Sequence, residues 1–279
     1  MKPAKRRFGQ HFLRDTGTLD RLVRLIEPAK GDSIIEIGAG EGAVSARIAP
    51  HVSRYVAIEI DADRLEPLRR VLAPWPHASV IQGDALEMDW SPLLNAAGQG
   101  SMRTRLIGNL PYNVATAVIH RSLRLKHPVH DMVYMVQYEV AQRIIAPPGG
   151  RSYGYLSIDS QHRAHVRLAL KVSPACFVPR PKVMSAVVTF RPRGVDPGSI
   201  LDRCFDDLVK AAFAHRRKTL ANSLRRHPDY CPVAAQMLAE AELDGERRPE
   251  AIAIGEYARL ALAYIRLSDP ERRQTGLLL

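Results

Sequence analysis

The segment Asn109-Leu110-Pro111-Tyr112 brings an amide, main-chain carbonyls, a proline and an aromatic ring together. The Asn109 side-chain oxygen and the carbonyl of Leu110 or Pro111 can accept hydrogen bonds from both N–H groups of a planar aromatic amine. Such an amine is a poor nucleophile because its lone pair is delocalised, and two acceptors localise that pair. Pro111 fixes its own φ and adds no competing donor, and Tyr112 offers a ring for base stacking. The segment predicts a catalytic site for adenine-like amines, and the alternative is an Asn-Pro-type turn beside a core tyrosine.

A glycine-rich segment lies upstream and is suited to a nucleotide-like cofactor. Gly38 and Gly40 follow a short apolar stretch, and glycines there let the backbone approach a ligand closely. Residues 38–43 also match the relaxed fingerprint G-x-G-x-x-A, with Glu59 about twenty residues further on. This pattern by itself fits a nicotinamide dinucleotide as well as S-adenosyl-L-methionine.

Glu36 favours S-adenosyl-L-methionine over the dinucleotide. It lies in a strand that we expect to be apolar on both faces, and a buried carboxylate is costly unless it is paired. The α-amino group of a methionine moiety is a suitable partner, whereas a dinucleotide offers no such cation near its pyrophosphate. The alternative is a Glu36 side chain that turns to solvent at the strand end. A sulfonium methyl is already activated, so positioning supplies most of the acceleration and no metal is predicted.

Two further acids end successive predicted strands. Glu59 can accept hydrogen bonds from both ribose hydroxyls, and Asp84 with the N–H of Ala85 can hold an adenine edge. Each acid alone is more often a cap or turn residue. Three of them at the carboxyl ends of successive strands point to the edge where open α/β sheets bind ligands.

The elements that must position these residues alternate between strands and helices. The apolar patterns predict strands at 33–37, 55–60, 79–82, 105–107, 131–136, 166–172 and 185–190. Helical spacing predicts helices at 16–29, 43–49, 62–72, 115–125, 155–165, 199–214, 217–226, 233–241 and 256–267. The predicted fold class is α/β: a Rossmann-like, class I methyltransferase sheet in residues 1–194 and a small all-helical domain in residues 195–279.

The net charge of the chain is +11, and two segments account for it. Residues 1–14 hold five basic side chains and no acid, and residues 210–227 hold six and no acid. Such patches point to a polyanion or a membrane surface, and the alternative is two solvated basic faces.

The three cysteines lack C-x-x-C spacing, so neither a disulfide framework nor a zinc site is predicted. We expect neither a membrane helix nor a signal peptide, which fits the cytoplasm.

Several segments resemble the small-subunit (16S) rRNA adenine dimethyltransferases, the dimethyladenosine transferase family, over nearly the whole chain. The matching segments are Phe8-Gly9-Gln10-His11-Phe12-Leu13, Glu36-Ile37-Gly38-Ala39-Gly40, Gly83-Asp84-Ala85, Asn109-Leu110-Pro111-Tyr112-Asn113, Phe177-Val178-Pro179-Arg180-Pro181-Lys182-Val183 with Ser185, and Phe213 to Leu224. The last of these is the most specific for this family over its relatives.

The resemblance implies S-adenosyl-L-methionine-dependent N6,N6-dimethylation of two adjacent adenines. The target is a hairpin loop near the 3′ end of 16S rRNA, in the small ribosomal subunit or its precursor. The cofactor-contacting residues would be His11, Leu13, Glu36, Gly38, Gly40, Glu59, Asp84, Ala85 and Asn109. The resemblance also puts Phe177 opposite Tyr112, so that a flipped base would lie between the two rings. Without the resemblance, Phe177 fits a plain core position equally well.

The basic segments then acquire a role in RNA binding. The predicted phosphate-binding residues are Lys5, Arg6, Arg7, Arg216, Arg217 and Lys218. Residues 1–194 would bind the cofactor and catalyse, residues 195–279 would bind rRNA, and we expect a monomer. Two departures from the family pattern are Tyr138, where many relatives have Lys, and His11, where others have Asn.

Three other functions remain open at this point. A large-subunit rRNA methyltransferase of the macrolide-resistance type shares the fold and the Asn109–Tyr112 motif, but the Arg216–Leu224 segment argues against it. A non-enzymatic assembly or transcription factor is opposed by the intact motif and the three acids. A nicotinamide oxidoreductase is opposed by Glu36 and by the lack of an obvious acid for hydride transfer.

Overall fold

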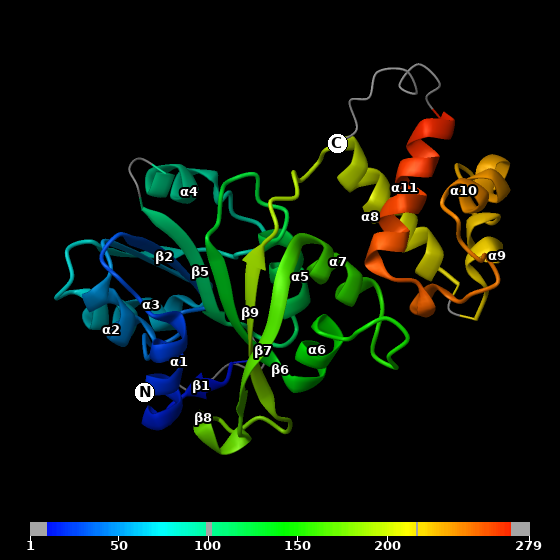
Figure 1. Cartoon of the computed structure of the whole chain (residues 1–279). Coiled ribbons are helices and arrows are strands. Elements are labelled where there is room, and N and C mark those ends of the chain that lie inside the picture. The colour runs from blue at the N-terminus through cyan, green and yellow to red at the C-terminus, as the bar shows by residue number, and fades with distance from the viewer. Residues whose placement is uncertain (1–9, 99–101, 216, 269–279) are drawn as a thin grey trace. The chain divides into compact units, whose positions relative to one another are not determined.

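The computed structural model of the chain describes residues 10–98, 102–215 and 217–268 (Figure 1). The chain divides into two compact units. The first unit comprises residues up to 142 together with residues 164–193, and the second comprises residues 143–163 together with those from 194 onward. Among the described residues, no helix is both long and apolar enough to cross a membrane.

The first unit is built on one mixed sheet. Its strands are β2 (Asp32–Ile37), β3 (Arg54–Glu59), β4 (Ala78–Gln82), β5 (Arg103–Asn109), β6 (Asp131–Gln137), β7 (Ala164–Val172) and β9 (Ser185–Pro192). They are arranged in the order β4-β3-β2-β5-β6-β9-β7. The strands from β4 to β6 are parallel, and β9 is antiparallel to both β6 and β7. Two short strands, β1 (Phe12–Leu13) and β8 (Phe177–Val178), pair separately and were not predicted.

Helices connect these strands, and the two at Ser91–Gly98 and Tyr138–Ile144 were not predicted from the sequence. The helices are α1 (Thr16–Ile26), α2 (Ser45–Ile48), α3 (Ala62–Leu72), α4 (Ser91–Gly98), α5 (Ala115–Ser122) and α6 (Tyr138–Ile144), the last of which runs into the second unit. Asp15 caps α1 by accepting a hydrogen bond from the N–H of Thr18 at 2.7 Å. The helix ends at Ile26, before the predicted end at 29, because Glu27 has a left-handed φ of 49°.

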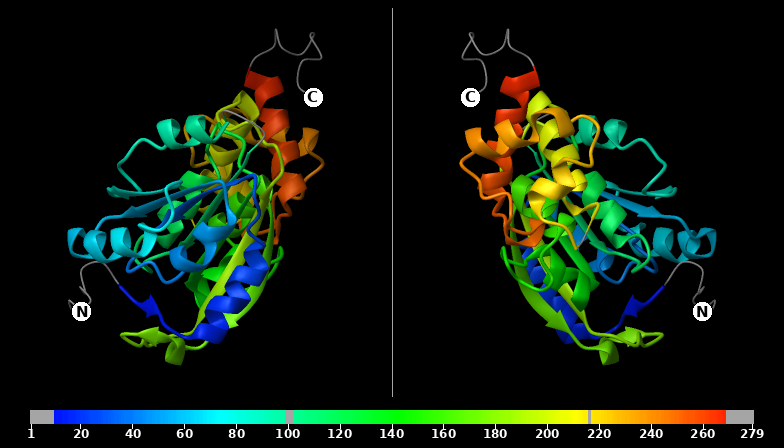
Figure 2. Two further views of the ribbon diagram at one scale, coloured as in Figure 1. Left: turned by 90° about the vertical axis from the view of Figure 1, so that its left-hand side faces the viewer. Right: turned by 90° about the vertical axis from the view of Figure 1, so that its right-hand side faces the viewer.

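The sheet is covered on both faces. On one face, Leu22 of α1 and Leu68 of α3 share a core with Ile34 of β2, and α1 lies along β9 (Figure 2). On the other face, the hydroxyls of Ser122 in α5 and Tyr134 in β6 are 2.8 Å apart. All six residues of β2 are buried, as expected for a central parallel strand. The chain order reverses between β2 and β5, and the carboxyl ends of strands at such a switch point form the usual ligand site.

The second unit is helical. Its helices are α7 (Tyr155–Arg163), α8 (Ile200–Phe213), α9 (Leu220–Leu224), α10 (Ala234–Glu240) and α11 (Ile254–Ser268). Phe205 and Leu208 of α8 share a buried core with Tyr257 and Leu260 of α11. Helix α9 begins at Leu220, later than the predicted 217, because the Thr219 hydroxyl caps it there.

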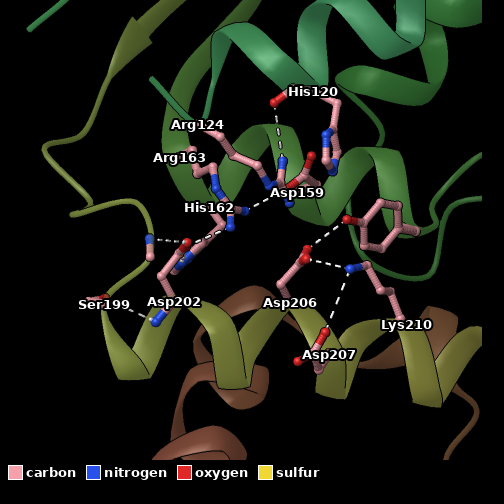
Figure 3. A network of polar contacts seen from close by, with 12 residues as sticks. His120, Arg124, Asp159, His162, Arg163, Ser199, Asp202, Asp206, Asp207 and Lys210 are labelled. Carbon is pink, nitrogen blue, oxygen red and sulfur yellow. Dashed lines mark hydrogen bonds and ion pairs between the residues drawn. The ribbon is translucent and has the colours of Figure 1, made fainter. Parts of the chain in front are cut away.

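The units divide after residue 193, next to the predicted boundary after residue 194, but the chain also passes between the units after residues 142 and 163. Residues 143–163, which the sequence assigned to the first domain, belong to the helical unit. The physical reason is visible in Figure 3, where Arg163 at the end of α7 donates to Asp159 at 2.5 Å and to Asp202 of α8 at 2.6 Å. The side chains of all three residues are buried, so this ion-pair network and the hydroxyl of Tyr155, 2.6 Å from Asp206, tie α7 to α8.

Candidate active site

Two neighbouring cavities lie at the carboxyl ends of β2, β3 and β5. Each has a volume of about 80 Å³, and both are lined by Gly38, Ile60 and Pro111. The first is also lined by the predicted site residues His11, Leu13, Glu36, Gly40, Glu59, Asn109, Leu110 and Tyr112, and the second by Asp84 and Ala85. The structure therefore brings all but one of the predicted catalytic and cofactor-binding residues to one edge of the sheet.

The glycine loop after β2 needs its glycines for backbone conformation. Gly38 and Gly40 have φ values of 71° and 58°, in the left-handed region that side chains with a Cβ disfavour. A Cβ on Gly40 would also lie 3.0 Å from the ring of Phe12. The loop thus packs against the N-terminal segment while its main chain faces the cavity.

Glu59 holds this loop in place. One carboxylate oxygen accepts from the N–H of Gly40 at 2.7 Å, and the other accepts from the N–H of Asp61 at 2.9 Å. Burial raises the pKa of Glu59 above its usual value, against the lowering effect of these backbone hydrogen bonds. The carboxylate therefore joins the glycine loop to the end of β3 and keeps lone pairs for further donors.

Glu36 is only 2 % exposed, which excludes the alternative of a side chain turned to solvent. The hydroxyls of Ser45 and Tyr55 both donate to its Oε2 atom, the Tyr55 bond being 2.7 Å long. Burial, as the largest cause, raises the pKa of Glu36 to about 7 despite these two hydrogen bonds. No basic side chain among the described residues forms an ion pair with Glu36, so a cationic ligand group in the cavity would meet an uncompensated carboxylate.

Asp84 follows β4 and shapes the second cavity. Its Oδ1 atom accepts from the N–H of Leu86 at 2.8 Å, so the carboxylate caps the turn that carries Ala85. The role of a turn residue, which was the alternative for each acid, is therefore real for Asp84. It does not exclude ligand contact, because the residue also lines the cavity.

Asn109 ends β5 and is held by the N-terminal segment. Its Nδ2 atom donates to the main-chain carbonyl of His11 at 2.9 Å, which leaves its Oδ1 atom as an acceptor. The carbonyl of Pro111 already accepts the N–H groups of Val114 and Ala115 at 3.1 and 3.0 Å. Of the two predicted main-chain acceptors, Leu110 is therefore the one whose carbonyl is not used by the start of α5.

The Tyr112 ring lies beside this pair of acceptors. Its hydroxyl is 2.7 Å from the Ser185 hydroxyl, and burial raises the pKa of Tyr112 above its usual value. The ring centroids of His11 and Tyr112 are 5.4 Å apart, and His11 Nδ1 is 2.7 Å from the carbonyl of Pro179. The ring of Tyr112 is thus fixed at its far end and covered by a residue of the N-terminal segment.

Phe177 is the exception among the predicted site residues. It is 3 % exposed, pairs with Leu13 across β1 and β8, and shares a core with Leu19 of α1. It lines neither of the two cavities. This position matches the core alternative, and stacking of a base on Phe177 remains a prediction that requires the ring to become accessible.

Sequence reasoning missed the polar side chains that fasten the N-terminal segment to the glycine loop. Arg64 of α3 is 1 % exposed, donates to Glu41 at 2.6 Å, and lies over the Phe12 ring at 4.9 Å. Gln10 donates to Asp61 at 2.9 Å. Gln10 lies in a recognised motif, but nothing in the spacing of Glu41, Asp61 and Arg64 indicates that they meet.

The predicted RNA-binding residues are only partly described. Lys5, Arg6, Arg7 and Arg216 lie outside the described residues. Arg217 and Lys218 are exposed just before α9, as phosphate contact requires. Tyr138, the departure from the family pattern, begins α6, and its ring lies 4.9 Å from the ammonium of Lys171.

Comparison with known proteins agrees with the resemblance seen in the motifs. Residues 1–264 match the family described as ribosomal RNA adenine dimethylase. Two similar curated proteins, from Chromohalobacter salexigens and Xylella fastidiosa, are each called ribosomal RNA small subunit methyltransferase A. The first is 38 % identical over 92 % of this chain and 90 % of its own length. The second is 39 % identical over 94 % and 96 %.

A solved structure supports the fold. The dimethyladenosine transferase of Plasmodium falciparum superposes with a TM-score of 0.79 and 21 % identity, covering 92 % of this chain and 98 % of that one. The seven-stranded sheet is accordingly that of the class I methyltransferases, as predicted.

Proposed function

The chain belongs to the ribosomal RNA adenine dimethylase family, and from this premise we propose that it dimethylates two adjacent adenines of 16S rRNA at N6. As a member, it is a methyltransferase that acts on adenine in ribosomal RNA. The proposed target is the hairpin loop near the 3′ end of that rRNA, in the cytoplasmic small subunit or its precursor. The names of the relatives support the small subunit over the large one.

The observation that carries the proposal is the orientation of Asn109. Because its Nδ2 atom donates to the His11 carbonyl, its Oδ1 atom is left to accept from the exocyclic amine of a base in the cavity. The Leu110 carbonyl is the second acceptor, since that of Pro111 is used by α5. Two such acceptors localise the lone pair of the amine, and Tyr112 supports the base from the side.

The residues of the two cavities fit S-adenosyl-L-methionine as the cofactor. Bound there, it would supply an activated methyl group. Glu36, a buried carboxylate that lacks a basic partner among the described residues, would hold the cationic amino group. Glu59 would accept ribose hydroxyls, Asp84 and Ala85 would hold the adenine edge, and the main chain at Gly38 and Gly40 would face the ligand.

The proposed RNA contacts lie in both units. Lys5, Arg6, Arg7, Arg216, Arg217 and Lys218 would bind phosphates, and the target adenine would leave the stack to reach Asn109. Phe177 would support the second face of the base once its ring is uncovered. Recognition would then rest on phosphates and hairpin shape, with the protein acting as a monomer.

The test is transfer of labelled methyl groups from S-adenosyl-L-methionine to isolated ribosomal subunits that lack these modifications. We expect labelling of small subunits, at two adjacent adenines near the 3′ end, and none of large subunits. Labelling of large subunits alone would favour the macrolide-resistance type of enzyme. If small subunits bind but neither kind is labelled, the chain acts as an assembly factor and the proposal fails.

A further inference from the structure

A third cavity lies in the first unit, away from the candidate active site. It has a volume of about 380 Å³ and opens between the C-terminal end of α1 and the strands β6, β7 and β9. Its apolar lining comes from Leu25, Val133 and Val166, and its basic lining from His165, Arg167 and Arg191. A volume in this range matches sites that bind small molecules or single nucleotides.

This cavity is separate from the cofactor and catalytic cavities. Asp131, which also lines it, is the first residue of β6, whereas Met135 is the β6 residue paired with Asn109. At a rise of about 3.3 Å per residue, the two positions are about 13 Å apart along the strand. The third cavity therefore lies towards the amino ends of the parallel strands, and its occupant is not the target base.

The basic side chains of the cavity are concentrated by strand pairing. His165 lies opposite Arg191 and Arg167 lies opposite Thr189 in the antiparallel pair β7 and β9. Directly opposed residues project on the same face of a sheet, so Arg167 and Arg191 lie on one face as diagonal neighbours. An anion between these two guanidinium groups would offset the repulsion between their charges.

The acid at this cavity does not neutralise these arginines. Both oxygens of Asp131 are held by Arg105, at 2.7 and 2.8 Å, so its charge is already paired. Within the described part of the chain, the guanidinium groups of Arg167 and Arg191 make no ion pair or hydrogen bond. Both side chains are exposed, so they are available to a ligand.

From this combination we propose that the third cavity binds a nucleotide of the RNA substrate other than the target adenine. Arg167 and Arg191 grip its phosphate, as guanidinium groups do with their paired N–H donors. The apolar surface of Leu25, Val133 and Val166 supports its base or ribose. The inference rests on the proposed rRNA substrate, and it adds a phosphate contact on the strand face of the first unit.

The test compares the double variant R167A/R191A with R69A/R70A. The control removes the same charge from exposed positions in the last turn of α3, distant in the sequence from the cavity lining. We expect R167A/R191A to weaken binding to small subunits at least tenfold and, because both arginines hold one phosphate, to reduce the slope of log affinity against log salt by about one. The control should weaken binding by no more than about twofold and should leave the slope of log affinity against log salt nearly unchanged.

Two further measurements assign the effect to this cavity. Affinity for S-adenosyl-L-methionine and the methylation rate at saturating subunits should stay within about twofold of the unaltered protein, so that the loss appears in KM. A Leu25→p-azidophenylalanine variant should crosslink to rRNA outside the target loop. If R167A/R191A binds subunits as the control does, the inference is overturned. The inference is also overturned if R167A/R191A loses binding of free adenosine 5′-monophosphate but keeps the affinity of the unaltered protein for small subunits.

The proposed function is judged separately, by whether the unaltered protein methylates small subunits at all. A protein that methylates them normally while R167A/R191A matches its control refutes only the third-cavity contact. A protein that does not methylate them refutes the proposed reaction.

Discussion

The side-chain amide of Asn109 donates to the main-chain carbonyl of His11 at 2.9 Å, across 98 positions in the sequence. This bond fixes which end of the amide faces the cavity, because a carbonyl can only accept and must therefore meet the NH₂ group. The same His11 lies over Tyr112 and bonds to Pro179. The N-terminal segment thus sets the geometry of the acceptor.

Asn109→Asp tests this relationship. The substitution places a second oxygen against the His11 carbonyl, so the carboxylate must turn or displace the N-terminal segment. We expect methyl transfer in single turnovers to fall on the order of 10²-fold or more, and Asn109→Ala to do the same by removing the acceptor. Asn95→Ala, at an exposed position in α4, is the control and should retain full activity. Undiminished transfer by either Asn109 variant would remove this residue from the catalytic site.

Glu36 predicts a pH dependence of cofactor binding. Its pKa is raised to about 7, chiefly by burial, and the cationic amino group that we propose it binds would prefer the ionised form. Affinity for S-adenosyl-L-methionine should therefore fall about tenfold per pH unit below about 7 and level off above it. Glu36→Gln should bind weakly with a flat profile, whereas Glu246→Gln, at an exposed site in the second unit, should follow the original curve. Calorimetric titration between pH 5.5 and 8.5 measures this.

The same residue makes a prediction for stability without cofactor. A carboxyl whose pKa is raised on folding binds more protons in the folded state, so its contribution falls as pH rises from about 4.5 to about 7. Glu36→Gln should then raise the melting temperature at pH 8 and leave it nearly unchanged at pH 4.5. A lower melting temperature at pH 8 would mean that the carboxylate is stabilised by its hydroxyl partners more than burial costs it.

The residues of the candidate site could be predicted from the sequence more fully than their hydrogen bonds and burial. The glycine loop and the acids Glu36, Glu59 and Asp84 lie at or just after the carboxyl ends of parallel strands, so parallel pairing alone brings them to one edge. The amide orientation of Asn109 depends on a main-chain carbonyl, which no residue type reveals. The buried position of Phe177 depends on its pairing with β1, a strand too short for any pattern.

The placement of residues 143–163 in the second unit also depends on a contact that the sequence does not reveal. Amphipathic spacing predicts a helix at residues 155–165, which the structure has at Tyr155–Arg163, but it does not predict against which core the helix packs. The ion pair between Arg163 and Asp202 holds α7 against α8. Strands β7 and β9 lie between these two helices in the sequence. Such long-range ion pairs leave no periodic signal in the sequence.

Arg163→Met tests that ion-pair network. The change removes the cation between two buried carboxylates, and breaking a buried pair costs about 3–5 kcal/mol. The loss should appear as reduced hydrogen-exchange protection of α7 and α8. Arg266→Met is the matched control because its pair with Glu240 is largely exposed, where an ion pair contributes at most about 1 kcal/mol. Equal protection in the two variants would mean that apolar packing alone holds α7 to α8.

Gly40→Ala separates backbone strain from steric contact in the glycine loop. Gly40 and Gly149 both have positive φ, 58° and 78°, so an added Cβ strains each backbone by about 1–2 kcal/mol. Only at Gly40 does that Cβ meet a neighbour, the Phe12 ring at 3.0 Å, and this ring lies under the buried Arg64 guanidinium and has little room to yield.

Gly149→Ala should lower stability and leave cofactor affinity intact. Gly40→Ala should lower stability at least as much and weaken cofactor binding about tenfold or more, because the loop that Glu59 fastens must move away from the N-terminal segment. If calorimetry gives the two variants equal cofactor affinity, the loop tolerates the displacement and its packing against Phe12 does not set the cofactor site.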